Sequence, residues 1–202
     1  MQKAPTCRSE LLYCTWDYIH AIMSSVMNMT IRKATSRDID AIEKIYDHIH
    51  EAEDGGKIVT GWITGVYPVR ATAEAAMARD DMFVYEDKGE ILAAAVINKT
   101  QVDVYADGNW RYAAEADKVC VLHTLVVEPA AFGRGIGTDF VAFYESYAKD
   151  IGCTALRMDT NARNLAARSL YKKLGYIESG IVPCVFNGIP DVMLVLLEKK
   201  VG

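Results

Sequence analysis

The sequence lacks the residue patterns that mark disulfide scaffolds and metal centres. Its five cysteines are an odd number and form no C-x-x-C pair, and its four histidines are scattered along the chain. Such a set of cysteines argues against a disulfide framework or a zinc site and favours a reducing compartment. We therefore expect a cytoplasmic protein without a metal.

A surplus of positive charge is also missing, because the net charge is −5. Binding to a nucleic-acid backbone needs a basic face, so nucleic acid is not the expected partner. The apolar stretch within residues 1–28 contains Asp17 and His20 and has no small-x-small cleavage site, so neither a membrane span nor a signal peptide is expected. We interpret residues 1–28 as an N-terminal extension, either an added helix or a segment upstream of a start at Met27 or Met29.

Residues 29–202 have the composition and pattern of one globular domain. Hydrophobic residues make up 51% of the chain, enough for a full core, and no internal repeat or low-complexity linker divides it. Alternating and helical apolar periodicities predict strands and helices that follow one another along the chain. The expected strands are 30–34, 82–87, 91–98, 119–127, 154–159, 176–182 and 192–199, and the expected helices are 36–53, 72–79, 138–151 and 164–174.

The most informative stretch is 119–138, VCVLHTLVVEPAAFGRGIGT. Its apolar run predicts a strand covered on both faces, which Pro129 ends. Gly133, Gly135 and Gly137 follow, directly before a helical pattern. Glycines there, with the free N–H groups of the first helical turn, either form an anion cradle for a phosphate or make a plain structural loop. No Lys follows the glycines, and Phe140 stands where a dinucleotide fingerprint needs its third glycine.

A second stretch, DTNARNLAARSLYKKLGY at 159–176, decides between these readings. Together the two stretches resemble the GNAT superfamily of acyl-CoA-dependent N-acyltransferases. That family carries Gln/Arg-x-x-G-x-G/A on the turn and Asn-x-x-Ala-x-x-Leu-Tyr-x-x-x-Gly-Phe/Tyr on a later helix. The second pattern is complete here, whereas Phe132 stands where the first usually has Gln or Arg, which leaves Arg134 as the nearby charge. The resemblance implies an α/β fold with a mixed, mostly antiparallel sheet of six or seven strands and helices on both faces.

The resemblance also implies how acetyl-CoA binds, as co-substrate, without a metal. The central strand contacts the pantetheine arm, the glycine-rich turn holds the diphosphate, and the later helix adds a polar contact. The implied coenzyme-binding residues are Leu125, Val126, Val127, Phe132, Gly133, Arg134, Gly135, Ile136, Gly137, Thr138, Asn164, Ala167 and Tyr171. Backbone N–H groups near Leu125–Val127 are expected to polarise the thioester carbonyl.

The resemblance further implies that Tyr171 protonates the departing thiolate, although a helix tyrosine can instead simply pack on the sheet. Asn164 either contacts the coenzyme, caps its helix, or does both. An amine acceptor must also lose a proton, and His123 is the candidate base, with a buried structural histidine as the alternative and Glu128 as a rival.

The acceptor is less well defined than the coenzyme. The aromatic residues expected to line its pocket are Trp62, Tyr67, Tyr105 and Trp110, which either bind an amine through cation–π contacts or anchor loops. Glu51, Glu53 and Asp54 could also hold a cationic acceptor. We expect acetyl transfer by direct attack of a primary amine, with a small-molecule acceptor. The alternatives are a protein or peptide acceptor and a non-catalytic acyl-CoA sensor, and a homodimer is common among relatives.

Overall fold

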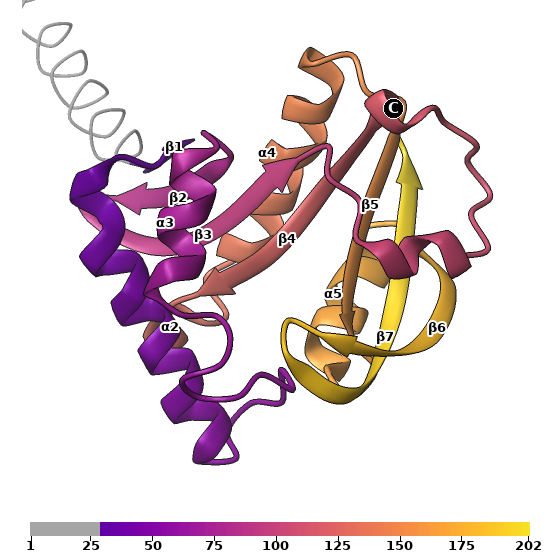
Figure 1. Ribbon diagram of the computed structural model, residues 1–202. Helices are drawn as coiled ribbons and strands as arrows, with labels where there is room; N and C mark the ends of the chain where they lie inside the picture. The colour runs from indigo at the N-terminus through magenta and orange to yellow at the C-terminus, as the bar shows by residue number, and fades with distance from the viewer. Residues whose placement is uncertain (1–28) are drawn as a thin grey trace, which may run out of the picture.

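In the computed structural model, which describes residues 29–202, seven strands form one sheet in the order β1-β2-β3-β4-β5-β7-β6 (Figure 1). The strands are β1 (Met29–Lys33), β2 (Met82–Asp87), β3 (Glu90–Asn98), β4 (Val119–Val127), β5 (Ala155–Asn161), β6 (Ile177–Phe186) and β7 (Ile189–Lys200). Every neighbouring pair is antiparallel except β4 and β5, which run parallel. The expected mixed, mostly antiparallel sheet is confirmed.

Helices cover both faces of the sheet, as expected (Figure 1). The helices are α2 (Ile39–Asp54), α3 (Arg70–Ala78), α4 (Ile136–Asp150) and α5 (Leu165–Lys173). On α2, the apolar stripe from Ile39 to Ile49 is buried together with α3 against β2 and β3. This burial is the main source of stability for an amphipathic helix of this length.

The opposite face is covered by α4 and α5, and Tyr144 fixes α4 to the two parallel strands. Its buried hydroxyl is 2.7 Å from the carbonyl oxygen of Cys120 on β4 and 3.0 Å from that of Arg157 on β5. Because one hydroxyl bridges both strands, the β4–β5 pair is held together beneath α4. Strong burial accounts for the raised pKa of this phenol, which keeps it protonated.

The third layer, on the face of the sheet opposite α4 and α5, is completed by the long connection between β3 and β4, which includes the 3₁₀ segments η2 (Asp103–Asp107) and η3 (Ala116–Lys118). It packs on β5, β6 and β7, and Glu198 of β7 attaches it to the sheet. This fully buried carboxylate accepts hydrogen bonds from the N–H groups of Arg111 (2.6 Å) and Tyr112 (3.1 Å) and from the hydroxyl of Ser179 (2.7 Å). A buried carboxylate is tolerated because these donors replace its hydration.

The helix expected from residue 36 begins as a 3₁₀ turn (Ser36–Asp38) that leads into α2 at Ile39, and two further helix starts differ from the expected ones. The first turn of α4 begins at Ile136, two positions before Thr138, because Gly135 with φ of 85° serves as its N-cap. The helix expected to be capped by Thr72 begins at Arg70, and Thr72 lies within it, where its hydroxyl accepts a hydrogen bond from the N–H of Val69 (3.1 Å). Thr72 therefore acts from inside the first turn, which spacing alone does not distinguish from a cap.

The interpretation of residues 1–28 lies outside the described residues. From Met29 onward, no helix combines the length and the apolar character that crossing a membrane requires.

Candidate functional site

The site is organised by the divergence of the two parallel strands. β4 and β5 are paired only from Val119–Leu122 to Ala155–Met158. Beyond these residues β4 stays with β3, and β5 stays with β7, so that the two strands separate (Figure 1). Thr124, with φ of 50°, lies at the point where the β3–β4 register shifts. The divergence opens the centre of an otherwise continuous sheet.

Main-chain donors of β4 face this opening. The N–H of Glu128 donates to the carbonyl oxygen of Leu92 on β3 (2.8 Å). Because successive N–H groups of a strand point in opposite directions, those of Val127 and Leu125 point away from β3, toward the separated β5. The N–H groups of Leu125 and Val127 are therefore available to a ligand in the opening.

A cavity of about 260 Å³ occupies the opening. It brings together segments that are far apart in the sequence: the loop before α3, β4, the turn after β4, β5, α5 and the β6–β7 hairpin. Most of the expected site residues lie on its wall: Trp62, Tyr67, His123, Leu125, Val126, Val127, Phe132, Gly137, Asn164, Ala167 and Tyr171.

The glycine-rich turn has the backbone of an anion cradle. Gly133 and Gly135 adopt φ of 79° and 85°. Within residues 29–202, the main-chain N–H groups of Gly133, Gly135 and Ile136 through Thr138 have no backbone acceptor. At Gly137 a Cβ would lie 3.3 Å from Leu170 Cδ2, so glycine allows α4 and α5 to pack closely. The free amides and the positive end of the α4 dipole make this turn suited to hold an anion.

The two side chains of the turn are placed differently from each other. Phe132 is 48% exposed and borders the cavity. Arg134 donates from Nη2 to Asp87 Oδ2 at 2.7 Å, and it therefore leans toward the β2–β3 hairpin. The Arg134 side chain is exposed and that of Asp87 is only partly buried, so this ion pair adds little to stability. In this arrangement the cradle depends on main-chain amides, because the Arg134 guanidinium is paired with Asp87.

On α5, Asn164 and Tyr171 both face the cavity. Asn164 caps the helix, because its Oδ1 accepts the N–H of Ala167 at 3.1 Å, and its amide N–H₂ group is left to bind a ligand. The ring of Tyr171 packs edge-on against Tyr176, with centroids 6.0 Å apart. No hydrogen bond to its hydroxyl is formed by the part of the chain that the structure describes, although the residue is only 7% exposed. Burial, with a smaller contribution from the charge of Asp159, raises the pKa of Tyr171, so this phenol stays protonated.

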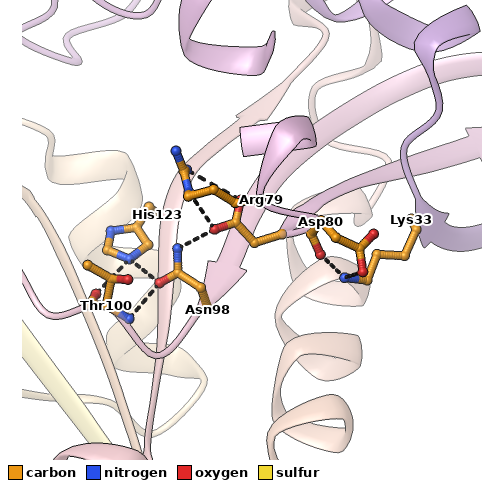
Figure 2. A network of polar contacts seen from close by, with 7 residues as sticks. Lys33, Arg79, Asp80, Asn98, Thr100 and His123 are labelled. Carbon is orange, nitrogen blue, oxygen red and sulfur yellow. Dashed lines mark hydrogen bonds and ion pairs between the residues drawn. The ribbon is translucent and has the colours of Figure 1, made fainter. Parts of the chain in front are cut away.

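His123 lies on the cavity wall at the end of a polar network that leads away from it. Its Nε2 is 3.1 Å from both Asn98 Oδ1 and the carbonyl oxygen of Thr100. Figure 2 shows the network continuing, as Asn98 donates to Asp81 (2.8 Å), which also accepts from Arg79 (3.0 Å). Since both partners of Nε2 are acceptors, Nε2 carries the proton and Nδ1 holds the lone pair. Burial lowers the pKa of His123 to about 4, so the ring is neutral at pH 7 and only weakly basic.

The other candidate acids have structural partners. Glu128 Oε2 is 2.8 Å from His48 Nδ1, and its Oε1 caps the turn by accepting the N–H of Ala130. Glu53 accepts from the Thr60 hydroxyl (2.7 Å) and from the N–H of Gly61 (3.0 Å), and Asp54 accepts from Thr64 (2.9 Å). These carboxylates hold the loop that follows α2, while Glu51 is exposed.

The four aromatic candidates form two pairs. Trp62 and Tyr67 pack edge-on at 5.9 Å and line the cavity, where the Tyr67 hydroxyl is hydrogen-bonded to Thr124. Tyr105 and Trp110 pack at 5.4 Å beneath the β3–β4 connection. Trp110 supports the Arg157 guanidinium, 4.0 Å from the ring centroid, and donates to the Tyr105 carbonyl oxygen (2.7 Å). The structure thus places the first pair on the cavity and Trp110 in the packing of the connection.

Several of the described residues on the cavity were not among those expected, and the one with an ionisable side chain is Asp159 of β5. Its Oδ2 accepts a hydrogen bond from the Tyr105 hydroxyl at 2.8 Å. Burial raises the pKa of Asp159 to about 6, and the Tyr105 hydrogen bond offsets part of that rise. The sequence does contain a signal for this site residue, because Asp159 is an acidic residue that continues the alternating side-chain pattern of the buried strand β5. No group of His, Cys, Asp or Glu side chains from Met29 to Gly202 is arranged to hold a metal ion.

Comparisons with known proteins identify the family of the chain and relatives that share its fold. The sequence profile of the acetyltransferase (GNAT) family matches residues 42–176. Two uncharacterized N-acetyltransferases from Methanocaldococcus jannaschii are similar in sequence. One is 27% identical over 80% of this chain and 66% of its own length, so this chain spans just under two thirds of that relative. The other is 22% identical over 85% of this chain and 92% of its own length.

Solved structures share the fold at low sequence identity. A proposed phosphinothricin N-acetyltransferase superposes with a TM-score of 0.64 at 19% identity, covering 86% of this chain and 99% of that chain. The ribosomal-protein-S18-alanine N-acetyltransferase of Escherichia coli gives 0.59 at 17%, covering 86% and 94%. A Salmonella typhimurium protein solved with its cofactor acetyl-CoA gives 0.58 at 20%, covering 87% and 95%. The first two are named for acceptors of different kinds, so the shared fold does not identify an acceptor.

Proposed function

Since this chain belongs to the acetyltransferase (GNAT) family, we propose that it transfers an acetyl group from acetyl-CoA to the primary amine of a small molecule by direct attack. One observation carries the proposal. The cavity at the opening of the sheet is lined by Phe132 and Gly137 from the two ends of the glycine-rich turn, by Leu125 and Val127 of β4, and by Tyr171, whose hydroxyl is unpaired within the described chain. Gly133, Gly135, Ile136 and Thr138, with their free N–H groups, lie between Phe132 and Gly137 or directly beside them in the chain.

The residues present fit coenzyme A. Its diphosphate needs closely spaced donors, and the amides of Gly133, Gly135 and Ile136–Thr138 are free of backbone acceptors in the described chain. A pantetheine arm carries amide groups, and the outward N–H groups of Leu125 and Val127 can pair with them as a neighbouring strand would. Bound acetyl-CoA supplies an activated acyl group as a thioester.

Tyr171 is suited to donate a proton to the leaving sulfur. Its raised pKa keeps the hydroxyl protonated at neutral pH, while a thiol titrates near ~8.5. The raised pKa also makes the phenol a weaker acid than a thiol in water. A thiolate that leaves inside the same buried site has its basicity raised by burial as well, and the phenol donates to it as the carbon–sulfur bond breaks. No partner in the described chain competes for the hydroxyl.

Direct attack is favoured over a covalent enzyme intermediate by the state of the described cysteines. Burial raises the pKa of Cys120 to about 12, so it remains a thiol, and it is packed in the core beneath α4. Cys153 is buried in the same core. Cys184 of β6 is only partly buried, but burial raises its pKa as well. A nucleophilic cysteine needs a lowered pKa together with access to substrate, and none of these three residues has both.

The walls of the cavity favour a small acceptor over a peptide. Its lining includes Trp62 and Tyr67 of the loop before α3, Val102 of the β3–β4 connection and Phe186 of the β6–β7 hairpin. A cavity of about 260 Å³ that is lined by two loops and a hairpin suits a small amine better than an extended peptide acceptor.

The test is an acceptor panel of polyamines, amino acids, aminoglycosides and short peptides, assayed by thiol release from acetyl-CoA. We expect amine-dependent release with at least one small amine and none with the peptides. Release only with peptides would refute the small-molecule assignment. If coenzyme A binds but no amine stimulates release, the transferase function itself is contradicted.

A further inference from the structure

We propose, on the basis of the function proposed above, that Asp159 holds the ammonium group of the acceptor in the cavity and takes up the proton that the amine must lose before it attacks. Tyr105 is the positioning residue that fixes its carboxylate. The acceptor class that follows is a primary alkylammonium ion with an apolar body.

The first argument is that Asp159 is a carboxylate without a cation. It lines the cavity, yet among the ion pairs of the described residues none involves it. Arg157, two positions earlier on β5, is the nearest candidate by sequence. Its guanidinium lies over Trp110, hydrogen-bonds Gln101, and has its pKa influenced by Glu198 rather than by Asp159. An uncompensated acid inside a protein is costly, and a cationic ligand would remove that cost.

The second argument is that one oxygen of the carboxylate is free. The Tyr105 hydroxyl occupies Oδ2 at 2.8 Å, and no donor from residues 29–202 reaches Oδ1. Because Oδ1 is not sealed from the cavity, it can accept a hydrogen bond from a ligand N–H. A charge-assisted bond of this kind is about twice as strong as a neutral one.

The third argument is the set of groups that face Asp159. From the loop before α3 comes Tyr67, from η2 comes Tyr105, and from α5 comes Tyr171, each with a pKa raised in part by the Asp159 charge. Cys184 of β6 responds in the same direction, and His123 of β4 shares the cavity as a neutral ring. None of these groups is a cation at pH 7, so the ammonium would be the only positive charge at the carboxylate within the described site. Tyr67 and Trp62 add ring faces and edges to the cavity wall, an environment that suits an ammonium with an apolar body.

The proton balance follows from these positions. Asp159 takes one proton from the ammonium and later loses it to solvent, which leaves a neutral amine whose electron pair forms the nitrogen–carbon bond. Tyr171 gives its hydroxyl proton to sulfur as the carbon–sulfur bond breaks and its electron pair remains on sulfur. The second proton lost by nitrogen restores Tyr171. Asp159 must therefore be ionised at the start, and its pKa of about 6 meets that condition at neutral pH while leaving it basic enough to accept a proton.

The test uses butylammonium chloride as the charged probe and hydroxylamine, which is largely uncharged at pH 7.5, as the matched acceptor. In calorimetry on the coenzyme A complex, Asp159→Asn should weaken butylammonium binding by about 10- to 100-fold. It should leave coenzyme A binding unchanged, which verifies the fold. In the thiol-release assay, Asp159→Asn should depress the rate with butylamine by on the order of 100-fold and change the rate with hydroxylamine by less than about threefold.

Equal butylammonium binding by the two proteins, no measurable binding by the wild type at millimolar probe, or equal loss with both acceptors would overturn the proposal. If Asp159-dependent binding is found without any thiol release, the ammonium site stands and the transferase function fails. A second variant tests the proposal independently if Asp159→Asn does not fold. Because the Tyr105 hydrogen bond lowers the Asp159 pKa, Tyr105→Phe should move the acidic limb of the pH–rate profile from near pH 6 to higher pH. An unmoved limb would contradict the positioning role.

Discussion

Replacing Tyr171 by phenylalanine removes a single hydroxyl from the site and little else. The ring packs edge-on against Tyr176 and within the core beneath α4, and phenylalanine preserves both contacts. The hydroxyl makes no hydrogen bond within the described chain, so no partner is left unsatisfied. We therefore expect the free energy of unfolding to change by less than about 1 kcal/mol, measured by urea denaturation.

The catalytic effect should be much larger than the structural one. Loss of a positioned proton donor typically lowers a rate by about 10²–10⁴-fold, which corresponds to roughly 3–5 kcal/mol at 1.36 kcal/mol per tenfold. Thiol release from acetyl-CoA with the best amine of the panel gives kcat, and calorimetry gives the dissociation constant of coenzyme A. We expect kcat to fall by at least 100-fold and the dissociation constant to change by less than about threefold.

Phe143→Leu, on the neighbouring α4 and away from the cavity, is a suitable control because it perturbs the same core without touching the hydroxyl. A Tyr171→Phe enzyme with kcat within threefold of the wild type would refute the role of Tyr171 as acid. A parallel loss of coenzyme affinity would show instead that the residue supports binding.

Three further predictions concern the base, the cradle and the third layer. The pKa of His123 falls from 6.5 to about 4 on folding, so its contribution to stability is present above pH 6.5 and is lost as the pH falls toward 4. His123→Gln should remove up to about 3 kcal/mol of that acid sensitivity in urea titrations and should leave the acidic limb of the pH–rate profile near pH 6 in place. Abolition of that limb would identify His123 as the base. Gly135→Ala, at φ of 85°, should lower the free energy of unfolding by about 1–2 kcal/mol and weaken coenzyme A binding. The control Gly152→Ala, at φ of 73° outside the cradle, should lower the free energy of unfolding by a similar amount without affecting binding, and equal losses of binding in the two variants would contradict the cradle. Glu198→Ala should destabilise the protein by about 3–5 kcal/mol in urea, because three donors lose their buried acceptor and Arg157 loses a nearby opposite charge. A loss under about 1 kcal/mol would contradict its structural role.

The elements of the fold could be predicted from the sequence because their signals are local. The stripe from Ile39 to Ile49 has the helical period, and the turn at Lys88 and Gly89 adopts the positive φ angles of 54° and 84° that a tight hairpin requires. The glycine-rich turn and the Tyr171 helix were recognised for the same reason, since each motif lies within one continuous stretch.

What could not be predicted depends on pairs of residues that are distant in the sequence. The partner of Arg134 is Asp87 on another hairpin, and Glu128 meets His48 across the packing of α2. The exposure of Asp159 to the cavity depends on where β4 leaves β5, and that divergence follows from sheet register and not from the composition of either strand. Trp110 shares the aromatic character of Trp62, but only the three-dimensional packing separates an anchor from a cavity wall.

The most direct test of the account is a crystal structure of the protein with coenzyme A. The account predicts the diphosphate within hydrogen-bonding distance of the N–H groups of Gly133, Gly135 and Ile136–Thr138, the pantetheine arm along Leu125–Val127, and the sulfur beside the Tyr171 hydroxyl. A diphosphate bound away from the turn, or a sulfur that lies outside the β4–β5 opening, would contradict it.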